Sequence, residues 1–295
     1  MKRARFSLIA AMVIFSSIGL LRRHLPIPSG TLALARAVIG AAFLGAILLL
    51  SRNSVHRGAV RKNLGLLLLS GFALGLNWVL LFESYNHTTV ATATLCYYTA
   101  PMLVILLSPF LFREAIHWKE GICIACALVG IILVSGVTRT GFAPQELRGV
   151  LLGLGAAVFY ACVMVLNKRI QGIPPLVRTT VQLSAAALIL LPYSIAVEDF
   201  LPVMPNGTQL ILLAIAGIVH TGIAYALYFH AVALLPAQST ALLSYIDPIG
   251  AIAISALILG EAMTPEAVIG TVLILASSLV RELHSLRFFP LQKRG

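Results

Sequence analysis

The residues with the clearest chemical potential lie in two copies of one short pattern. Each copy contains a tyrosine, a proline and a glutamate, namely Tyr98, Pro101 and Glu114, then Tyr245, Pro248 and Glu261, at a constant offset of 147 positions. A proline inside an apolar helix removes a backbone hydrogen bond, and in a membrane the freed carbonyl needs a partner from protein or cavity water. We therefore expect the two prolines to bend helices that line a cavity and the two tyrosines to contact a solute. The alternative is that the prolines shape packing and the tyrosines bond backbone carbonyls.

Asp247 is the most informative charged residue, because it lies near the middle of an apolar stretch, directly before Pro248. A carboxylate at the centre of a bilayer costs about 2.5–3.5 kcal/mol on insertion scales, so such a group usually faces a cavity or a partner. Burial favours the neutral form of a carboxyl group, which is the chemistry of proton coupling. Asp247 is thus either a coupling residue or a static partner of Arg36 or of a neighbouring helix.

Three further charged or titratable residues are candidates for charge recognition. Arg36 can bind a carboxylate with two hydrogen bonds, or extend its side chain toward the membrane surface. Glu83, near a helix end, can attract a cationic group at a cavity mouth or simply lie at the water interface. His220 can relay protons, since histidine titrates near neutral pH, or serve as a hydrogen-bonded packing element.

Aromatic side chains form stripes along three of the expected helices. We expect Trp78, Tyr160 and Tyr225 to contribute to a wall that suits an apolar or aromatic solute, with Asn77 available for polar contacts. Tyr85 and Tyr228, closer to the ends of their stretches, fit the aromatic belt at the membrane interface.

Other recurring residues indicate structural roles. Glu114 and Glu261 each follow a proline-containing stretch and are expected to tie together the short loop into the next helix. The pairs Gly71/Gly75 and Gly149/Gly153 have the spacing of close helix packing in membranes. The four cysteines all lie within apolar stretches, where no disulfide framework or metal site is indicated.

The elements that must position these residues are membrane-spanning helices. The chain is 59% hydrophobic and 11% charged, whereas soluble domains average about 25% charged residues. Ten apolar runs have roughly the 17–25 residues that cross a bilayer: 6–21, 30–50, 64–84, 90–112, 116–136, 149–167, 176–197, 208–230, 236–259 and 266–281. The fold class is therefore an all-α polytopic membrane protein with ten transmembrane helices.

The net charge of +11 reflects topology and does not indicate nucleic-acid binding. With the N-terminus inside, 16 of the 21 basic residues fall in inner segments and four in outer ones. This asymmetry is the positive-inside pattern, so both termini are expected in the cytoplasm. The inner basic clusters also suit anionic lipid headgroups.

The constant offset divides the chain into two repeats. We expect a first repeat over 1–136, a linker over 137–148 and a second repeat over 149–295 that ends in a short basic tail. Five spans per repeat is an odd number, so the second repeat enters the membrane from the opposite side. In inverted repeats the substrate site lies near the midplane between the halves.

Residues 76–114 and 121–136 resemble the first EamA domain of the drug/metabolite transporter superfamily, and residues 225–277 resemble the second. The resemblance rests on the doubled proline and glutamate positions. It implies a ten-helix inverted-repeat carrier in the bacterial inner membrane. The superfamily moves amino acids, other small metabolites, nucleotide sugars and drugs.

The expected function is secondary transport of a small metabolite by alternating access. The expected solutes are amino acids or related compounds, including aromatic and amphipathic ones, with export favoured. The expected partners are this solute, the bilayer and protons, with no cofactor and no metal. A chain that contains both halves can act as a monomer. No nucleophile–base or metal constellation points to an enzyme. The rival interpretation is a membrane sensor or assembly component on a degenerate carrier fold, with a closed interior.

Overall fold

A computed structural model describes residues 2–50, 57–112, 118–136, 144–198 and 206–288, and within these ranges every regular element is a helix. The first half contains α1 (Lys2–Ser16), α2 (Ile18–Arg23), α3 (Ser29–Leu50), α4 (Arg57–Lys62), α5 (Leu64–His87), α6 (Val90–Tyr97), α7 (Ala100–Phe112) and α8 (Trp118–Val134). The second half contains α10 (Pro144–Arg169), α11 (Pro175–Val197), α12 (Gly207–Ala214), the π-helical segment η1 (Ile215–Ile223), α13 (Ala224–Leu234), α14 (Ala237–Ser244), α15 (Ile246–Leu257) and α16 (Pro265–Phe288).

The helices have the length and composition of a membrane bundle. Among the described residues, seven helical stretches are long and apolar enough to cross a bilayer, and three shorter apolar helices cover Glu120–Val134, Leu242–Leu257 and Pro265–Val280. Large apolar side chains point outward, and Leu49, Leu50 and Leu188 are 84%, 84% and 71% exposed. An apolar exterior of this kind is stable against lipid, so the protein is a multi-pass membrane protein.

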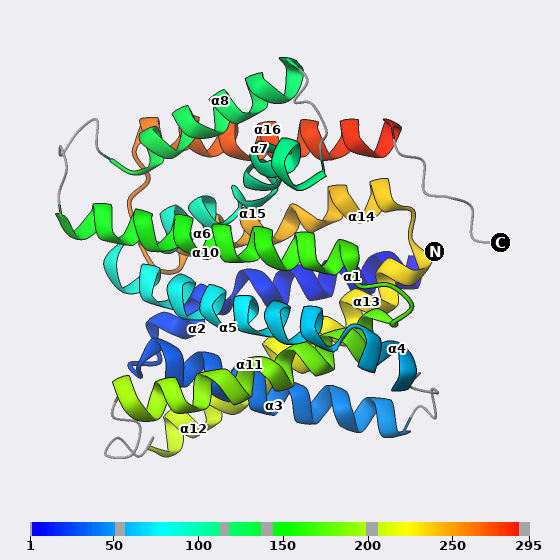
Figure 1. Ribbon diagram of the computed structural model, residues 1–295. Coiled ribbons are helices and arrows are strands. Elements are labelled where there is room, and N and C mark those ends of the chain that lie inside the picture. Colours follow the sequence, from blue (N-terminus) through cyan, green and yellow to red (C-terminus); the bar gives the residue numbers. More distant parts are fainter. Residues whose placement is uncertain (1, 51–56, 113–117, 137–143, 199–205, 289–295) are drawn as a thin grey trace.

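The contacts between helices repeat when the two halves are exchanged. α1 packs against α13 and α15, and its counterpart α10 packs against α5, α6 and α7. α3 packs against η1, and its counterpart α11 packs against α5. Two further pairs, α3 with α11 and α8 with α16, join equivalent helices of the two halves and lie at opposite edges of the bundle (Figure 1).

Glycine allows the closest of these approaches. A methyl carbon added at Gly71 of α5 would lie 2.5 Å from Cβ of Ala185 and 2.6 Å from the carbonyl oxygen of Gln182, both on α11. A methyl carbon at Gly153 of α10 would lie 3.0 Å from Cβ of Cys96 on α6. Gly71 thus lies at a contact that leaves no room for a side chain, and at Gly153 an added methyl group would be tightly packed.

Several helices are interrupted near the middle of the bundle. α6 and α7 are separated at Tyr98 and Thr99, and α14 and α15 are separated at Tyr245. Each break is followed by a proline: Pro101 lies in the first turn of α7, and Pro248 lies in the first turn of α15. The prolines therefore stand at helix restarts, and the two tyrosines lie in the breaks themselves.

The chain ends and the junction of the halves complete the arrangement. The start of α1 and the end of α16 lie at the same end of the bundle (Figure 1). The helix α10 begins at Pro144, so residues 144–148 of the expected linker are helical, and residues 137–143 lie outside the described residues.

Candidate functional site: a central aromatic cavity

A cavity of about 360 Å³ lies in the middle of the bundle and is lined by residues of both halves. Its volume is within the range of small-molecule sites, roughly 300–1,000 Å³. The lining comes from α1, α2, α3, α5 and the α6–α7 break in the first half. In the second half it comes from α10, α13, the α14–α15 break and α16. We call this space the central cavity.

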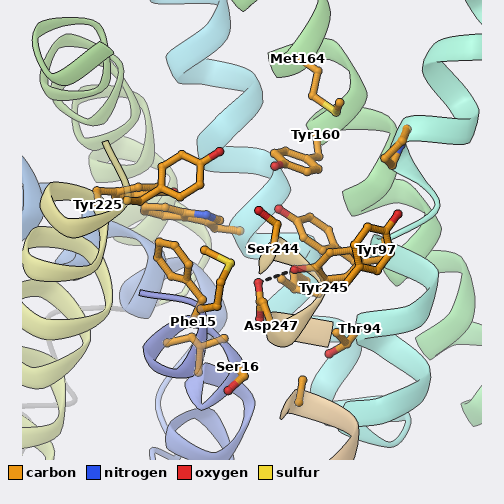
Figure 2. Close-up of a pocket in the computed structure, with 18 of the residues that line it drawn as sticks. Phe15, Ser16, Thr94, Tyr97, Tyr160, Met164, Tyr225, Ser244, Tyr245 and Asp247 are labelled. Atoms are coloured by element: carbon orange, nitrogen blue, oxygen red, sulfur yellow. Dashed lines mark hydrogen bonds between the residues drawn. The ribbon is translucent and has the colours of Figure 1, made fainter. Parts of the chain in front are cut away.

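Tyrosine dominates the wall of the central cavity. Seven of the eight tyrosines in the chain line it: Tyr85, Tyr97, Tyr98, Tyr160, Tyr225, Tyr228 and Tyr245. The rings of Tyr97 and Tyr160 stack with their centroids 4.9 Å apart, and Phe15 packs against Tyr225 at 5.3 Å. Figure 2 shows Phe15 and Tyr225 facing Tyr97 and Tyr245 across the cavity. Such rings offer apolar surface together with hydroxyl groups.

An acidic group lies on one side of the central cavity. Asp247, in the first turn of α15, accepts a hydrogen bond at Oδ2 from the hydroxyl of Tyr98, which lies in the α6–α7 break of the other half (Figure 2). No ion pair joins Asp247 to Arg36, and both side chains are described. Of the two static roles considered for Asp247, the hydrogen bond to a neighbouring helix is present and the pairing with Arg36 is absent.

A basic group lies on the wall formed by α3 and α5. Arg36 is only 5% exposed, and its Nε donates to Oγ1 of Thr221 at 3.1 Å. Its guanidinium carbon lies 4.2 Å from the ring centroid of Trp78 and 5.3 Å from that of Phe82. Arg36 therefore does not extend to the membrane surface. It lines the cavity and makes cation–π contacts with Trp78 and Phe82.

Most of the residues expected to contact a solute lie in this lining. Trp78, Tyr98, Tyr160, Tyr225 and Tyr245 all do, together with Asp247, Arg36 and Pro101. Pro248 is buried and is not one of the lining residues.

Three expected site residues lie elsewhere. Asn77 is fully buried between α5 and α10 and donates to the carbonyl of Ala156 at 2.7 Å. Glu83 accepts hydrogen bonds from Ser29 at 2.8 Å and from Asn86 at 2.9 Å. These partners hold Asn77 and Glu83 in helix contacts, outside the cavity lining.

His220 is also absent from the lining. Its Nε2 lies 3.0 Å from Oγ of Ser17, at the junction of α1 and α2, and its Nδ1 lies 3.4 Å from the carbonyl oxygen of Ile215. In the structure it is a packing contact between η1 and the α1–α2 junction.

Glu261 ties together more than its own loop. Its Oε2 accepts from the backbone N–H of Val90, the first residue of α6, at 2.8 Å, and from the hydroxyl of Ser255. Its Oε1 pairs with Arg23 at 2.7 Å, and the same Nη2 of Arg23 donates to the carbonyl of Thr88 at 2.9 Å. This cluster joins both halves at the end of the bundle where α2 ends. Glu114 lies outside the described residues.

Several lining residues were not expected from the sequence. Tyr97 is adjacent to Tyr98, which was expected to contact the solute, and both tyrosines line the cavity at the break between α6 and α7. Phe15 and Met12 carry no signal that distinguishes them from other apolar residues of α1. Tyr85 is 2% exposed and Tyr228 is partly buried, and both line the cavity, so the interfacial assignment of these two tyrosines was wrong.

Comparison with known proteins agrees with this architecture. A crystal structure aligns over 98% of this chain and 99% of its own, with a TM-score of 0.66 and 23% sequence identity, which supports the fold. An uncharacterized transporter, YxxF, from Bacillus subtilis strain 168 is 31% identical over 92% of this chain and 87% of its own. Protein RarD from Streptomyces exfoliatus is 25% identical over 88% and 82% of the two chains. The EamA-like transporter family matches residues 3–136 and 147–281. The predicted resemblance is thereby confirmed, and the chain belongs to the EamA-like transporter family.

Proposed function

We propose that this protein is a secondary transporter that moves a small metabolite, an amino acid or a related amphipathic compound, across the bacterial inner membrane. The observation that carries the proposal is the central cavity, whose tyrosine wall is supplied by both halves of the chain. Its size and its mixture of aromatic, hydroxyl and charged groups suit a small organic solute. Since one chain supplies the whole wall, a monomer is a complete carrier.

Alternating access fits the way in which the two ends of the cavity differ. At the end where α2 terminates, Glu261, Arg23 and Val90 connect both halves. Toward the opposite end, the lining continues to Met164 of α10 and Tyr228 of α13. In the predicted orientation the end joined by Glu261 and Arg23 is the outer one, and we propose that the solute enters from the cytoplasm. This supports export, with the outer cluster separating when the carrier opens outward.

Proton coupling through Asp247 is the energy source that we favour. A carboxyl group inside the bundle can hold either a proton or a cationic group of the solute, and either one neutralises its charge. Mutual exclusion of proton and solute at one carboxylate is sufficient for antiport. The hydrogen bond from Tyr98 supports the ionised form when both are absent.

The rival function is a membrane sensor or assembly component that transports nothing. It requires a closed interior, whereas this bundle contains a cavity of about 360 Å³. The carrier is therefore the better supported of the two.

Untargeted metabolite profiling tests the proposed function. Cells that overproduce the protein are compared with cells that carry an empty vector and with cells that produce Asp247→Asn, and the medium and the cytoplasm are both measured. We expect a small set of amino-acid-like metabolites to rise in the medium only with the unaltered protein. Identical profiles in all three strains, with the protein present in the membrane, would contradict transport.

A further inference from the structure

The central cavity has two poles of opposite charge, and the solute can be inferred from them. Among the described residues that line it, Arg36 is the only basic side chain and Asp247 the only acidic one. Neither is part of an ion pair. A buried charge without a counterion is costly, so each pole favours a solute group of opposite charge, and at Asp247 a proton is the alternative.

The guanidinium of Arg36 is oriented for a second partner. Only Nε is used inside the protein, in the bond to Thr221, while Nη1 and Nη2 have no hydrogen-bond partner among the described residues. The guanidinium carbon lies 4.2 Å from the ring centroid of Trp78, a cation–π contact that holds the group beside the ring. The planar guanidinium offers two parallel N–H donors, which match the two oxygens of a carboxylate.

The π-helical segment η1 explains how Arg36 is held in place. The hydroxyl of Thr221 donates to the carbonyl of Ala216, five residues earlier, at 3.0 Å, and accepts from Arg36 at 3.1 Å. A methyl carbon added at Gly217 would lie 2.6 Å from Cγ2 of Ile39, so η1 and α3 approach too closely for larger side chains. π-helical turns are rare and occur frequently at functional sites.

We propose that the solute is a zwitterion whose carboxylate binds the terminal nitrogens of Arg36 and whose amine binds near Asp247 and Tyr98, with Thr221 as the residue that positions Arg36. This assignment rests on the proposed function and adds which residue recognises which group. A dianion is disfavoured because the described lining holds only one cation. The aromatic wall between the two poles accommodates the apolar part of the solute.

The experiment measures binding to the purified full chain in detergent, independently of transport. Trp118 is 73% exposed and Trp78 lies beneath Arg36, so in a Trp118→Phe background the emission of Trp78 reports on the carboxylate pole. The probes are triads built on alanine, leucine and phenylalanine. Each triad compares the free amino acid with its amide, which lacks the carboxylate, and with its N-acetyl derivative, which lacks the amine charge.

We expect at least one free amino acid to bind about tenfold or more tightly than either derivative, the effect of losing one charged hydrogen-bonded contact. Arg36→Gln should abolish the preference over the amide and keep the preference over the N-acetyl compound. Asp247→Asn should do the opposite. Arg169→Gln, a change at the exposed end of α10, is the matched control and should leave both preferences unchanged.

The role of Thr221 has its own test. Thr221→Val should reduce the preference for the amino acid over its amide without changing the affinity for the amide, and Thr221→Ser should restore it. A mere loss of packing would weaken all three probes equally. Size-exclusion chromatography and thermal unfolding check that each variant is folded.

The proposal is overturned if no triad shows a preference for the free amino acid, or if Arg36→Gln keeps the discrimination against the amide. The proposed function fails separately. Selective binding without flux in proteoliposomes would contradict the transport function and support the zwitterion site. Flux without selectivity for the carboxylate would support transport and contradict the zwitterion site.

Discussion

Tyr98, in the break between α6 and α7, donates its hydroxyl hydrogen to Oδ2 of Asp247 in the first turn of α15, so the two interrupted helices meet through their side chains. The donor belongs to the first half of the chain and the acceptor to the second. Any rearrangement that moves the halves apart must stretch this bond. The bond therefore links the ionisation of Asp247 to the relative position of the two halves.

Asp247→Asn should uncouple solute movement from protons. The amide oxygen still accepts from Tyr98, but the side chain can no longer exchange a proton. In proteoliposomes we expect flux of a solute identified by profiling to lose its response to an imposed pH gradient, while exchange at equal pH continues. Tyr98→Phe is the companion variant, because it keeps the carboxyl group and should retain the response at a rate lower by about the effect of one hydrogen bond, severalfold. A pH response that persists in Asp247→Asn would place coupling on another group.

Much of the arrangement around this bond was predictable. The apolar runs predict the helices because a bilayer demands about 20 apolar residues per span. The doubled prolines predict where helices are interrupted, because proline cannot donate to the ladder. Asp247 was expected to face a cavity or a partner because a lone carboxylate is costly in lipid. These inferences depend only on local composition and on the bilayer, so they can be made without knowledge of tertiary contacts.

Which side chains face the cavity depends on how each helix is rotated about its axis, and composition does not determine this rotation. Glu83 on α5 and His220 on η1 form hydrogen bonds with Ser29 and Ser17 on other elements, and such tertiary contacts are not visible in the sequence. The π-helical segment adds a residue to a turn, so Thr221 faces Arg36 while its neighbour His220 faces Ser17. A sequence does not reveal such a register shift, and assignments made on a regular helix fail at that point.

The ion pair between Arg23 and Glu261 should hold the outer end of the bundle closed. We expect Arg23→Ala to open this end more often, because it removes the only contact of Glu261 that carries opposite charge among the described residues. The measurement is labelling of a cysteine at Ile18, a cavity-lining residue of α2, by a membrane-impermeant thiol reagent added from outside, in a background without native cysteines. Labelling should be severalfold faster in Arg23→Ala, as expected for the loss of a partly buried charged contact.

Arg148→Ala is the matched control for this labelling, since Arg148 is an exposed arginine near the start of α10. It should leave the labelling rate unchanged. Equal rates in the unaltered protein and in Arg23→Ala would show that the ion pair does not hold the outer end closed.

Gly71→Leu should destabilise the contact between α5 and α11. The added side chain begins 2.5 Å from Cβ of Ala185 and 2.6 Å from the carbonyl oxygen of Gln182, so the helices must move apart. Overpacking of this kind costs about 1–3 kcal/mol. Thermal unfolding in detergent should show a lower midpoint for Gly71→Leu than for Gly65→Leu, because Gly65 of the same helix has no atom within 4 Å of an added methyl carbon. Equal midpoints would mean that α5 and α11 separate without cost.

Glu198→Ala should weaken the attachment of α3 at the outer end. The carboxylate of Glu198, just beyond α11, accepts from the backbone N–H groups of Gly30 and Thr31, both at 2.7 Å, and from the hydroxyl of Thr31 at 3.2 Å. These N–H groups are in the first turn of α3, where no residue of the helix itself can accept from them. Loss of such a cap costs about 0.5–2 kcal/mol. The cap also joins the first half to the second, so its loss should appear in thermal unfolding and as faster hydrogen exchange at the start of α3. Glu198→Gln keeps one acceptor oxygen, so its unfolding midpoint and its exchange rate should lie between those of the unaltered protein and Glu198→Ala. Equal exchange rates in Glu198→Ala and the unaltered protein would exclude the cap as a stabilising contact.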